Sequence, residues 1–112
     1  MVPFNNAYET IQVWLGRTNE VEIDFGEDVS TSSVSSQIRE EPNSQSPLIA
    51  QWTSSFKTNG ADGVVVLKLQ PTDLSSVTEE RGYMDIKRVV GGESVVDLDN
   101  HIKVIFIKPI TT

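Results

Sequence analysis

The segment 57–71, KTNGADGVVVLKLQP, decides the fold. Two turn-forming pairs, Asn59-Gly60 and Asp62-Gly63, stand directly before an apolar, β-branched run from Val64 to Leu69. Glycine adopts the positive φ angles of tight turns at no steric cost, and β-branched residues favour extended backbone. The segment therefore predicts a turn that leads into a strand over 64–69, and we expect this strand at the centre of a sheet.

Period-two alternation predicts further strands before this segment. Apolar and acidic residues alternate over 20–26, which indicates a strand with one wet face. The alternation returns over 34–39 and over 48–56, on either side of the turn-forming sequence PNSQSP. These two segments predict a hairpin whose second strand places Leu48, Ala50 and Trp52 on one face.

The residues after the central run predict one helical turn and several short strands. Pro71 suits the first turn of a helix, and we expect the helical turn to end near Gly82. Extended segments follow over 82–90, around 95–96 and over 101–109, with a Gly91-Gly92 turn after the first. The fold class that we predict is all-β: a single small antiparallel β-sandwich, immunoglobulin-like in architecture, of about six to eight strands with one short helical turn.

Length and composition are typical of one globular domain. The chain has 112 residues, of which 38% are hydrophobic and 22% charged. We expect an extended N-terminal arm over 1–10 and a β-sandwich domain over 11–112. The formal net charge of −7 repels phosphate groups, so we do not expect nucleic acid as a partner.

The sequence also argues against a membrane partner and against thiol chemistry. It has no apolar run of the roughly 18 residues that cross a bilayer, and its first residues lack the basic start of a signal peptide. We therefore expect a chain that is soluble. The absence of cysteine excludes disulfides, thiolate metal sites and a cysteine nucleophile.

No motif predicts catalysis, a metal site or a cofactor. His101 is the only histidine, and the spacings of zinc sites and hydrolase elbows are missing, so we expect it at the surface. Asp97, Asp99 and Asn100 have the alternating oxygens of a calcium loop but lack its glycine and distal Glu, which favours a polar turn. We expect a protein that is not an enzyme; a small hydrolase built on His101 is the weakest alternative.

Two charged residues interrupt apolar strands. Arg39 follows Ile38, and Asp85 lies between Met84 and Ile86. Each is either a solvent-facing residue, which we favour, or half of a partly buried ion pair that would fix strand register and take no part in catalysis. We expect Tyr83, Met84 and Ile86 in packing contacts, and we expect the other polar residues of this segment at the solvent or partner surface: Lys87, Arg88, Asp97, Asp99 and His101.

Aromatic residues near the N-terminus are candidates for partner contacts. Large aromatics contribute disproportionately to binding at interfaces, so we assign this role to Phe4, Tyr8 and Trp14. Trp14 fits either the core or an interface. Trp52, whose neighbours alternate, is predicted to be a core residue.

Four sequence phrases occur in an order that resembles a known module: SSQIREEPNSQSPLIAQWTSSF, DGVVVLKLQPTDLSSV, RGYMDIKRV and HIKVIFIKPITT. The module is a small β-sandwich of tailed-bacteriophage virion proteins, including the N-terminal modules of baseplate upper proteins and related tail, neck or capsid-accessory proteins. The resemblance covers roughly residues 10–112. Its matching positions are Ile38, Arg39, Leu48, Ile49, Asp62, Gly63, Thr72, Gly82, Tyr83, Asp85, Ile86 and Thr111.

The resemblance implies a non-enzymatic structural protein of the virion. Tail-associated members often carry further domains after the module, whereas this sequence ends at PITT, so we expect a capsid decoration or cement subunit that binds across major capsid protein subunits. The expected partners are the major capsid protein or other virion proteins. The expected location is the capsid exterior, after synthesis in the host cytoplasm, and the expected state is a homo-oligomer, trimer or dimer. The alternatives are a neck, baseplate or tail-fibre adaptor, and a carbohydrate- or ligand-binding β-sandwich module.

Overall fold

The computed structural model describes residues 10–95 and 101–110, which form eleven strands and one 3-10 turn. The all-β prediction is confirmed. The simple antiparallel sandwich of six to eight strands is wrong, because the strands form three sheets and β1 runs parallel to β11. The elements are β1 (Thr10–Trp14), β2 (Asn19–Asp24), β3 (Ser32–Ser35), β4 (Gln37–Arg39), β5 (Leu48–Gln51), β6 (Thr53–Phe56), β7 (Val64–Leu69), η1 (Pro71–Leu74), β8 (Arg81–Met84), β9 (Lys87–Val90), β10 (Glu93–Val95) and β11 (Ile102–Ile107).

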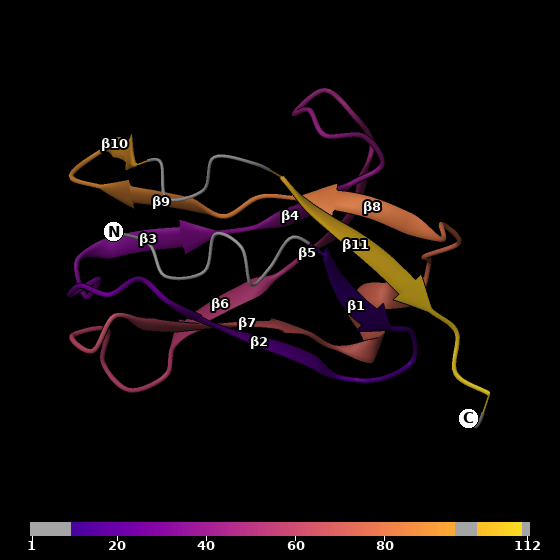
Figure 1. Ribbon diagram of the computed structural model, residues 1–112, viewed down its shortest axis with the longest axis horizontal. Helices are drawn as coiled ribbons and strands as arrows, with labels where there is room; N and C mark the ends of the chain where they lie inside the picture. Colours follow the sequence, from indigo (N-terminus) through magenta and orange to yellow (C-terminus); the bar gives the residue numbers. More distant parts are fainter. Residues whose placement is uncertain (1–9, 96–100, 111–112) are drawn as a thin grey trace.

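The three sheets enclose a single hydrophobic core. Their strand orders are β1-β11-β8-β4-β5, β10-β9-β3 and β2-β7-β6. Figure 1 shows β2, β7 and β6 on one side, with β3, β4, β8 and β9 on the other. Within residues 10–95 and 101–110 no helix has the length and hydrophobicity that crossing a membrane requires. The largest fully buried side chains come from both sides: Phe25, Ile23, Ile38, Leu67, Leu69, Val13, Val29, Val65 and Val104.

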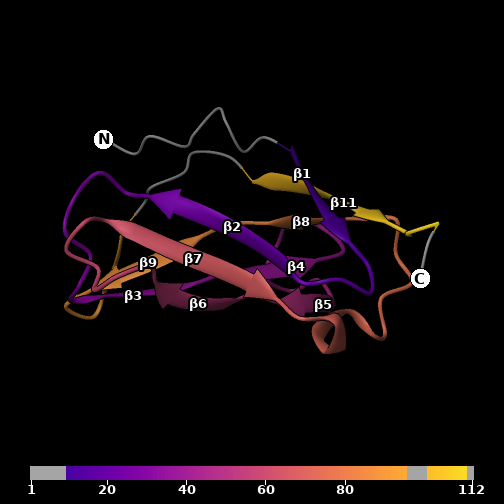
Figure 2. The same ribbon diagram turned by 90° about the horizontal axis from the view of Figure 1, so that it is seen from below.

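The strand predicted from Val64 to Leu69 is β7, the central strand of its sheet. It pairs antiparallel with β2 on one side and with β6 on the other (Figure 2). Val65, Leu67 and Leu69 are fully buried, whereas the side chains between them are half-buried. The turn that precedes β7 also has the predicted geometry, since Gly60 and Gly63 have φ angles of +86° and +80°.

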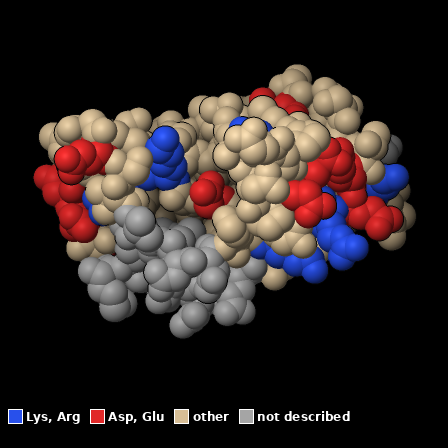
Figure 3. Space-filling view, turned by 90° about the horizontal axis from the view of Figure 1, so that it is seen from above, with Lys and Arg blue, Asp and Glu red and all other residues tan. Residues whose placement is uncertain are grey.

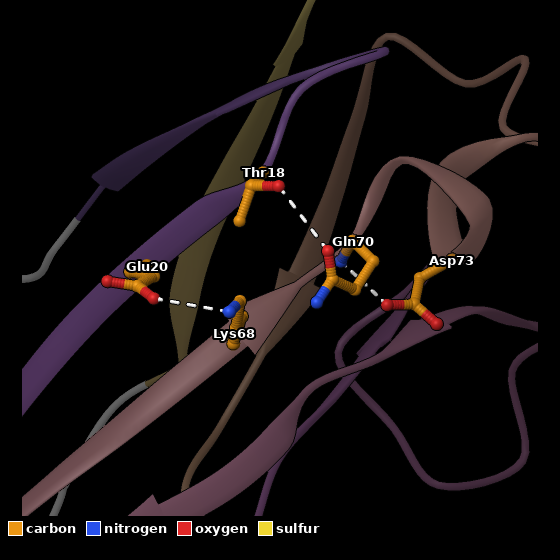
Figure 4. A network of polar contacts seen from close by, with 5 residues as sticks. All are labelled: Thr18, Glu20, Lys68, Gln70 and Asp73. Carbon is orange, nitrogen blue, oxygen red and sulfur yellow. Dashed lines mark hydrogen bonds and ion pairs between the residues drawn. The ribbon is translucent and has the colours of Figure 1, made fainter. Parts of the chain in front are cut away.

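The helical turn η1 begins with Pro71, as predicted, but ends at Leu74 and not near Gly82. The backbone N–H of Gln70 donates to Asp73 Oδ2 at 2.7 Å, and the Gln70 side chain lies 3.4 Å from Thr18 Oγ1 (Figure 4). Gly82 belongs to β8, where an added Cβ would lie 2.9 Å from a side-chain carbon of Ile38. It is therefore a packing glycine and not the end of a helix.

The predicted strand over 34–39 is divided into β3 and β4 at Ser36. Its partner strand is divided at the same level into β9 and β8, yet the register is unchanged, since Arg39 opposes Tyr83 and Ser35 opposes Lys87. β3-β4 and β8-β9 therefore form one continuous antiparallel ribbon. Its interruption has a physical cause: the Ser36 carbonyl accepts from Trp52 N at 3.0 Å, and Ser36 Oγ donates to the Asp85 carbonyl at 2.6 Å.

The predicted strand over 48–56 is also two strands, and it passes from one layer of the fold to the other. β5 pairs with β4, whereas β6, after Trp52, pairs with β7 in the other layer. The register between β4 and β5 shifts at Ile38 and Arg39. Because a shift by one residue reverses the side chain, Leu48 is 50% exposed while Ala50 and Trp52 are buried, which corrects the face predicted for Leu48.

Replacing Ser36 by alanine is expected to lower the free energy of unfolding by about 1–2 kcal/mol. Ser36 is buried, and its loss leaves the Asp85 carbonyl without the hydroxyl donor that joins the two strands at the interruption. Urea unfolding of the variant measures the effect. Ser33→Ala, an exposed serine of β3, is the matched control, and equal stability of the two variants would contradict this role of Ser36.

The prediction that Arg88 lies at the solvent or partner surface is wrong. It is a buried residue of β9, with its Cζ 5.2 Å from the centre of the Phe25 ring and Nη2 3.5 Å from Glu27 Oε1. Its long side chain thus attaches the loop after β2 to the ribbon.

In the same loop, two hydrogen bonds from Ser30 lower the pKa of Asp28, the larger effect coming from the Ser30 side chain and the smaller from its backbone. This carboxylate therefore favours folding above its unfolded-state pKa, and the contribution is lost as the pH falls through the folded-state pKa.

Candidate functional site

A groove of about 450 Å³ lies over the outer side of the ribbon. In Figure 1 the loop between β4 and β5 and the β9-β10 hairpin rise on this same side. Figure 3 shows the molecule from above the view of Figure 1, with both acidic and basic side chains on this face. The groove is lined by Ser35, Ser36, Gln37, Arg39, Glu41, Pro42, Asn43, Ser44, Tyr83, Met84, Asp85, Ile86, Lys87, Ser94, Val95 and His101.

The register of the ribbon places the polar side chains of the groove in cross-strand rows. Arg39 opposes Tyr83, and Ser35 opposes Lys87. Because the register is constant, Gln37 and Asp85 face each other between these rows. Odd-numbered residues of both strands thus point away from the core, whereas Ile38, Met84 and Ile86 between them are buried.

Arg39 is held in place by two hydrogen bonds. Its Nη1 donates to the Ser46 carbonyl and its Nη2 to Gln37 Oε1, each at 2.7 Å. Ser46 is itself buried, and its Oγ accepts from the backbone N–H of Glu41 at 2.8 Å. Arg39 therefore fixes the loop between β4 and β5 against the ribbon, so the position of this groove wall is set by the fold.

Among the ion pairs that join one described residue to another, none links Arg39 to Asp85. Both residues line the groove, but Arg39 donates to Ser46 and Gln37, and Asp85 is exposed. Asp85 does tie the strands together, through its backbone carbonyl, which accepts from Ser36 Oγ. Asp85 therefore joins the two strands through its backbone, and its side-chain charge takes no part in this contact.

The other residues expected at the surface or in packing contacts mostly lie where the sequence places them. Met84 and Ile86 are buried, His101 and Lys87 are exposed, and Tyr83 is half-buried. Asp97 and Asp99 lie outside the described residues, so the calcium-loop alternative stays a prediction. In the part of the chain that the structure describes, no three metal-ligating side chains are grouped closely enough to hold an ion.

A second candidate surface is formed by apolar residues on edge strands. Trp14 of β1, Leu48 of β5 and Phe56 of β6 are 36%, 50% and 37% exposed, and each belongs to a strand at the edge of its sheet. We call these three the edge residues. Trp14 was assigned to partner contacts from the sequence, whereas Leu48 and Phe56 were missed, because alternation does not show which strands are outermost.

The fold holds Trp14 firmly at the surface. Its backbone N–H donates to Asn19 Oδ1 and its carbonyl accepts from Asn19 Nδ2, both at 2.9 Å. The guanidinium of Arg17 lies 4.8 Å from the centre of the indole ring, a cation–π contact. Of the two positions left open by the sequence, core or interface, the structure gives the exposed one. Phe4 and Tyr8 lie outside the described residues.

The groove and the edge residues are the two candidate surfaces among the described residues. The groove brings together fixed polar groups, and the edges bring apolar side chains next to strand backbone. The chain matches no protein-family model and no curated protein sequence.

Proposed function

We propose that the chain is a non-enzymatic structural protein of a tailed-phage virion, a decoration or cement subunit of the capsid exterior. It would bind across neighbouring major capsid protein subunits and so stabilise the head. The observation that carries this proposal is the position of the edge residues, which lie on three edge strands of the all-β fold. The resemblance to small β-sandwich modules of virion proteins supports the same function.

Edge strands are suited to assembly because their outer N–H and C=O groups can pair with another chain. At Trp14 both backbone groups are bonded to the Asn19 side chain, so this residue would contribute through its indole ring. Trp14 adds a large apolar side chain to the edge at β1. Its backbone is fixed by Asn19 and its ring by Arg17, so little conformational freedom remains to be lost on binding. Such a preordered aromatic residue is typical of an interface anchor.

The placement of the edge residues favours bridging between subunits. Trp14 and Leu48 belong to β1 and β5, the two opposite edges of the five-stranded sheet. One edge can therefore contact a second copy of the chain, in a dimer or trimer, while the other contacts the shell. Weak contacts of this kind add up through multivalency when they repeat with capsid symmetry.

The proposal is tested first by the number of copies per particle, measured by quantitative mass spectrometry of purified virions. A shell-covering subunit is expected at hundreds of copies. On the order of a dozen copies would instead support the alternative of a neck, baseplate or tail-fibre adaptor. Absence from the virion would overturn both.

Replacing Trp14 by serine is expected to weaken binding to capsids that lack the protein by roughly tenfold or more, because an interface anchor is removed. Co-sedimentation with such capsids measures the affinity. Ile110→Ser is the matched control, since Ile110 is fully exposed and lies beyond the last strand. Unchanged binding by Trp14→Ser would show that the edge at β1 does not contact the shell.

A further inference from the structure

We propose that the groove over the ribbon binds an uncharged, polyhydroxylated ligand, a segment of a neutral oligosaccharide. This binding activity would be additional to assembly through the edge residues. The groove has a volume of about 450 Å³, within the roughly 300–1,000 Å³ that is usual for small-molecule sites. Three features of the groove indicate the class of ligand: its charges, its hydrogen-bonding side chains, and the limited exposure of strand backbone in its floor.

The charges that line the groove cancel. Arg39 and Lys87 are matched by Asp85 and Glu41, in a chain whose net charge is −7. An anionic ligand would approach the two carboxylates, and a cationic ligand would approach the guanidinium and the ammonium group. Each would meet like charge in the groove. A neutral ligand meets no such repulsion.

The hydrogen-bonding groups suit a ligand with many hydroxyls. Arg39 and Lys87 donate, Asp85 accepts, and the amide of Gln37 can do both. A hydroxyl group both donates and accepts, so a row of them can satisfy such a mixed surface. Tyr83, half-buried beside Arg39, offers an aromatic ring against which the C–H face of a sugar ring can pack.

An extended peptide is a poorer fit to this groove. Peptides that bind sheets usually add a strand at a free edge. At Arg39 and Tyr83 the floor is formed by interior strands, because β4 lies between β8 and β5, and β8 lies between β11 and β4. The strands β3 and β10, which also line the groove, are the edges of the three-stranded sheet β10-β9-β3. At the centre of the groove the ligand must therefore be recognised through side chains, which is how sugars are bound.

The groove wall is preorganised for binding. The hydrogen bonds from Arg39 to Ser46 and from Glu41 to Ser46 hold the loop between β4 and β5 in place. Arg39 also donates to Gln37, which orients the amide of this neighbouring lining residue. Little entropy is then lost when a ligand enters, which raises the affinity available from a few hydrogen bonds.

The test is a titration of the full ¹⁵N-labelled chain with neutral oligosaccharides of glucose and of N-acetylglucosamine, followed by amide chemical shifts. We expect saturable shifts confined to the residues that line the groove, in β3, β4, β8, β9, β10 and the loop between β4 and β5. An oligosaccharide of uronic acid is the charged comparison and is expected to bind more weakly. Absence of shifts with both neutral sugars, or binding of the uronic acid alone, would overturn the proposal.

Two variants locate the binding. Asp85→Ala is expected to weaken binding by roughly tenfold, because an acceptor for ligand hydroxyls is lost, and Asp85 is exposed, so folding is retained. Tyr83→Ala is expected to have a similar effect by removing the ring. Arg81→Ala is the control, an exposed residue of β8 on the same side that does not line the groove. Wild-type affinity of Asp85→Ala, or an equal loss in Arg81→Ala, would place the sugar elsewhere.

Discussion

Replacing Gly63 by alanine is expected to lower the free energy of unfolding by about 3 kcal/mol or more. Two costs combine at this position. The φ angle of +80° is unfavourable for any residue with a Cβ, by about 1–2 kcal/mol. The added Cβ would also lie 2.5 Å from the carbonyl oxygen of Glu27 and 3.1 Å from its backbone nitrogen.

The clash at Gly63 cannot be relieved by a side-chain rotation, because the atoms involved belong to the backbone. The backbone of Gly63 is held as well: its carbonyl accepts from Phe25 N at 2.9 Å, and its N–H donates to the Gly60 carbonyl at 3.1 Å. Movement of the backbone at Gly63 away from Glu27 would therefore break hydrogen bonds that close the turn before β7. Backbone strain and overpacking are among the causes of the largest losses of stability from single substitutions.

Gly91→Ala is the matched control for Gly63→Ala. Gly91 also has a positive φ, +59°, but an added Cβ would have no atom within 4 Å. This variant should therefore show only the conformational cost, about 1–2 kcal/mol. Urea unfolding of both variants separates the two costs. Equal stabilities would mean that the close approach to Glu27 contributes nothing.

The turn at Gly63 shows how far local sequence predicts this fold. The Asn59-Gly60 and Asp62-Gly63 pairs predicted positive φ angles and a strand after them, and both are present. The same holds for the Gly91-Gly92 turn and for β11. In each case the deciding property is carried by adjacent residues. The contact between Gly63 and Glu27 was not predictable, because it joins two loops distant in sequence.

The two strand interruptions show what local pattern misses. Alternation continues through Ser36 and through Trp52, although the chain changes sheet beside both. Each change depends on hydrogen bonds to a distant strand, from Trp52 N to Ser36 O and from Ser54 Oγ to Val34 O. A period-two pattern records which side chains are buried, but not which strand receives the backbone hydrogen bonds.

The groove was predictable in its parts but not as a site. The sequence favoured Asp85 and Lys87 at the surface and Met84 and Ile86 in packing contacts, and the structure agrees. What brings Arg39 opposite Tyr83 is the pairing of β4 with β8, which no local pattern specifies. Arg88 was predicted at the surface because it is charged. Its position in the alternation is that of the inward residues Met84 and Ile86, and the fold buries it against Phe25.

Trp52 is the residue at which the second large effect is expected. Trp52→Ala should lower the free energy of unfolding by about 3–5 kcal/mol, the usual range for a buried tryptophan. Trp52 is 3% exposed and stands between β5 and β6, where the chain passes from one layer to the other. The cavity left by alanine would therefore open in the hydrophobic core, beside the junction at which the chain passes between the layers.

Trp52→Phe distinguishes packing from hydrogen bonding at this junction. The indole Nε1 is buried and has no hydrogen-bond partner among the described residues. A buried N–H without a partner costs about 1–3 kcal/mol, and phenylalanine removes that cost while keeping an aromatic ring. Trp52→Phe should therefore be destabilised by less than about 2 kcal/mol, well below Trp52→Ala. Thermal unfolding of both, with the exposed Trp14→Ala as control, measures the difference. If phenylalanine is as costly as alanine, the indole shape or its N–H is required at the junction, and the assignment of Trp52 as a purely apolar packing residue is wrong.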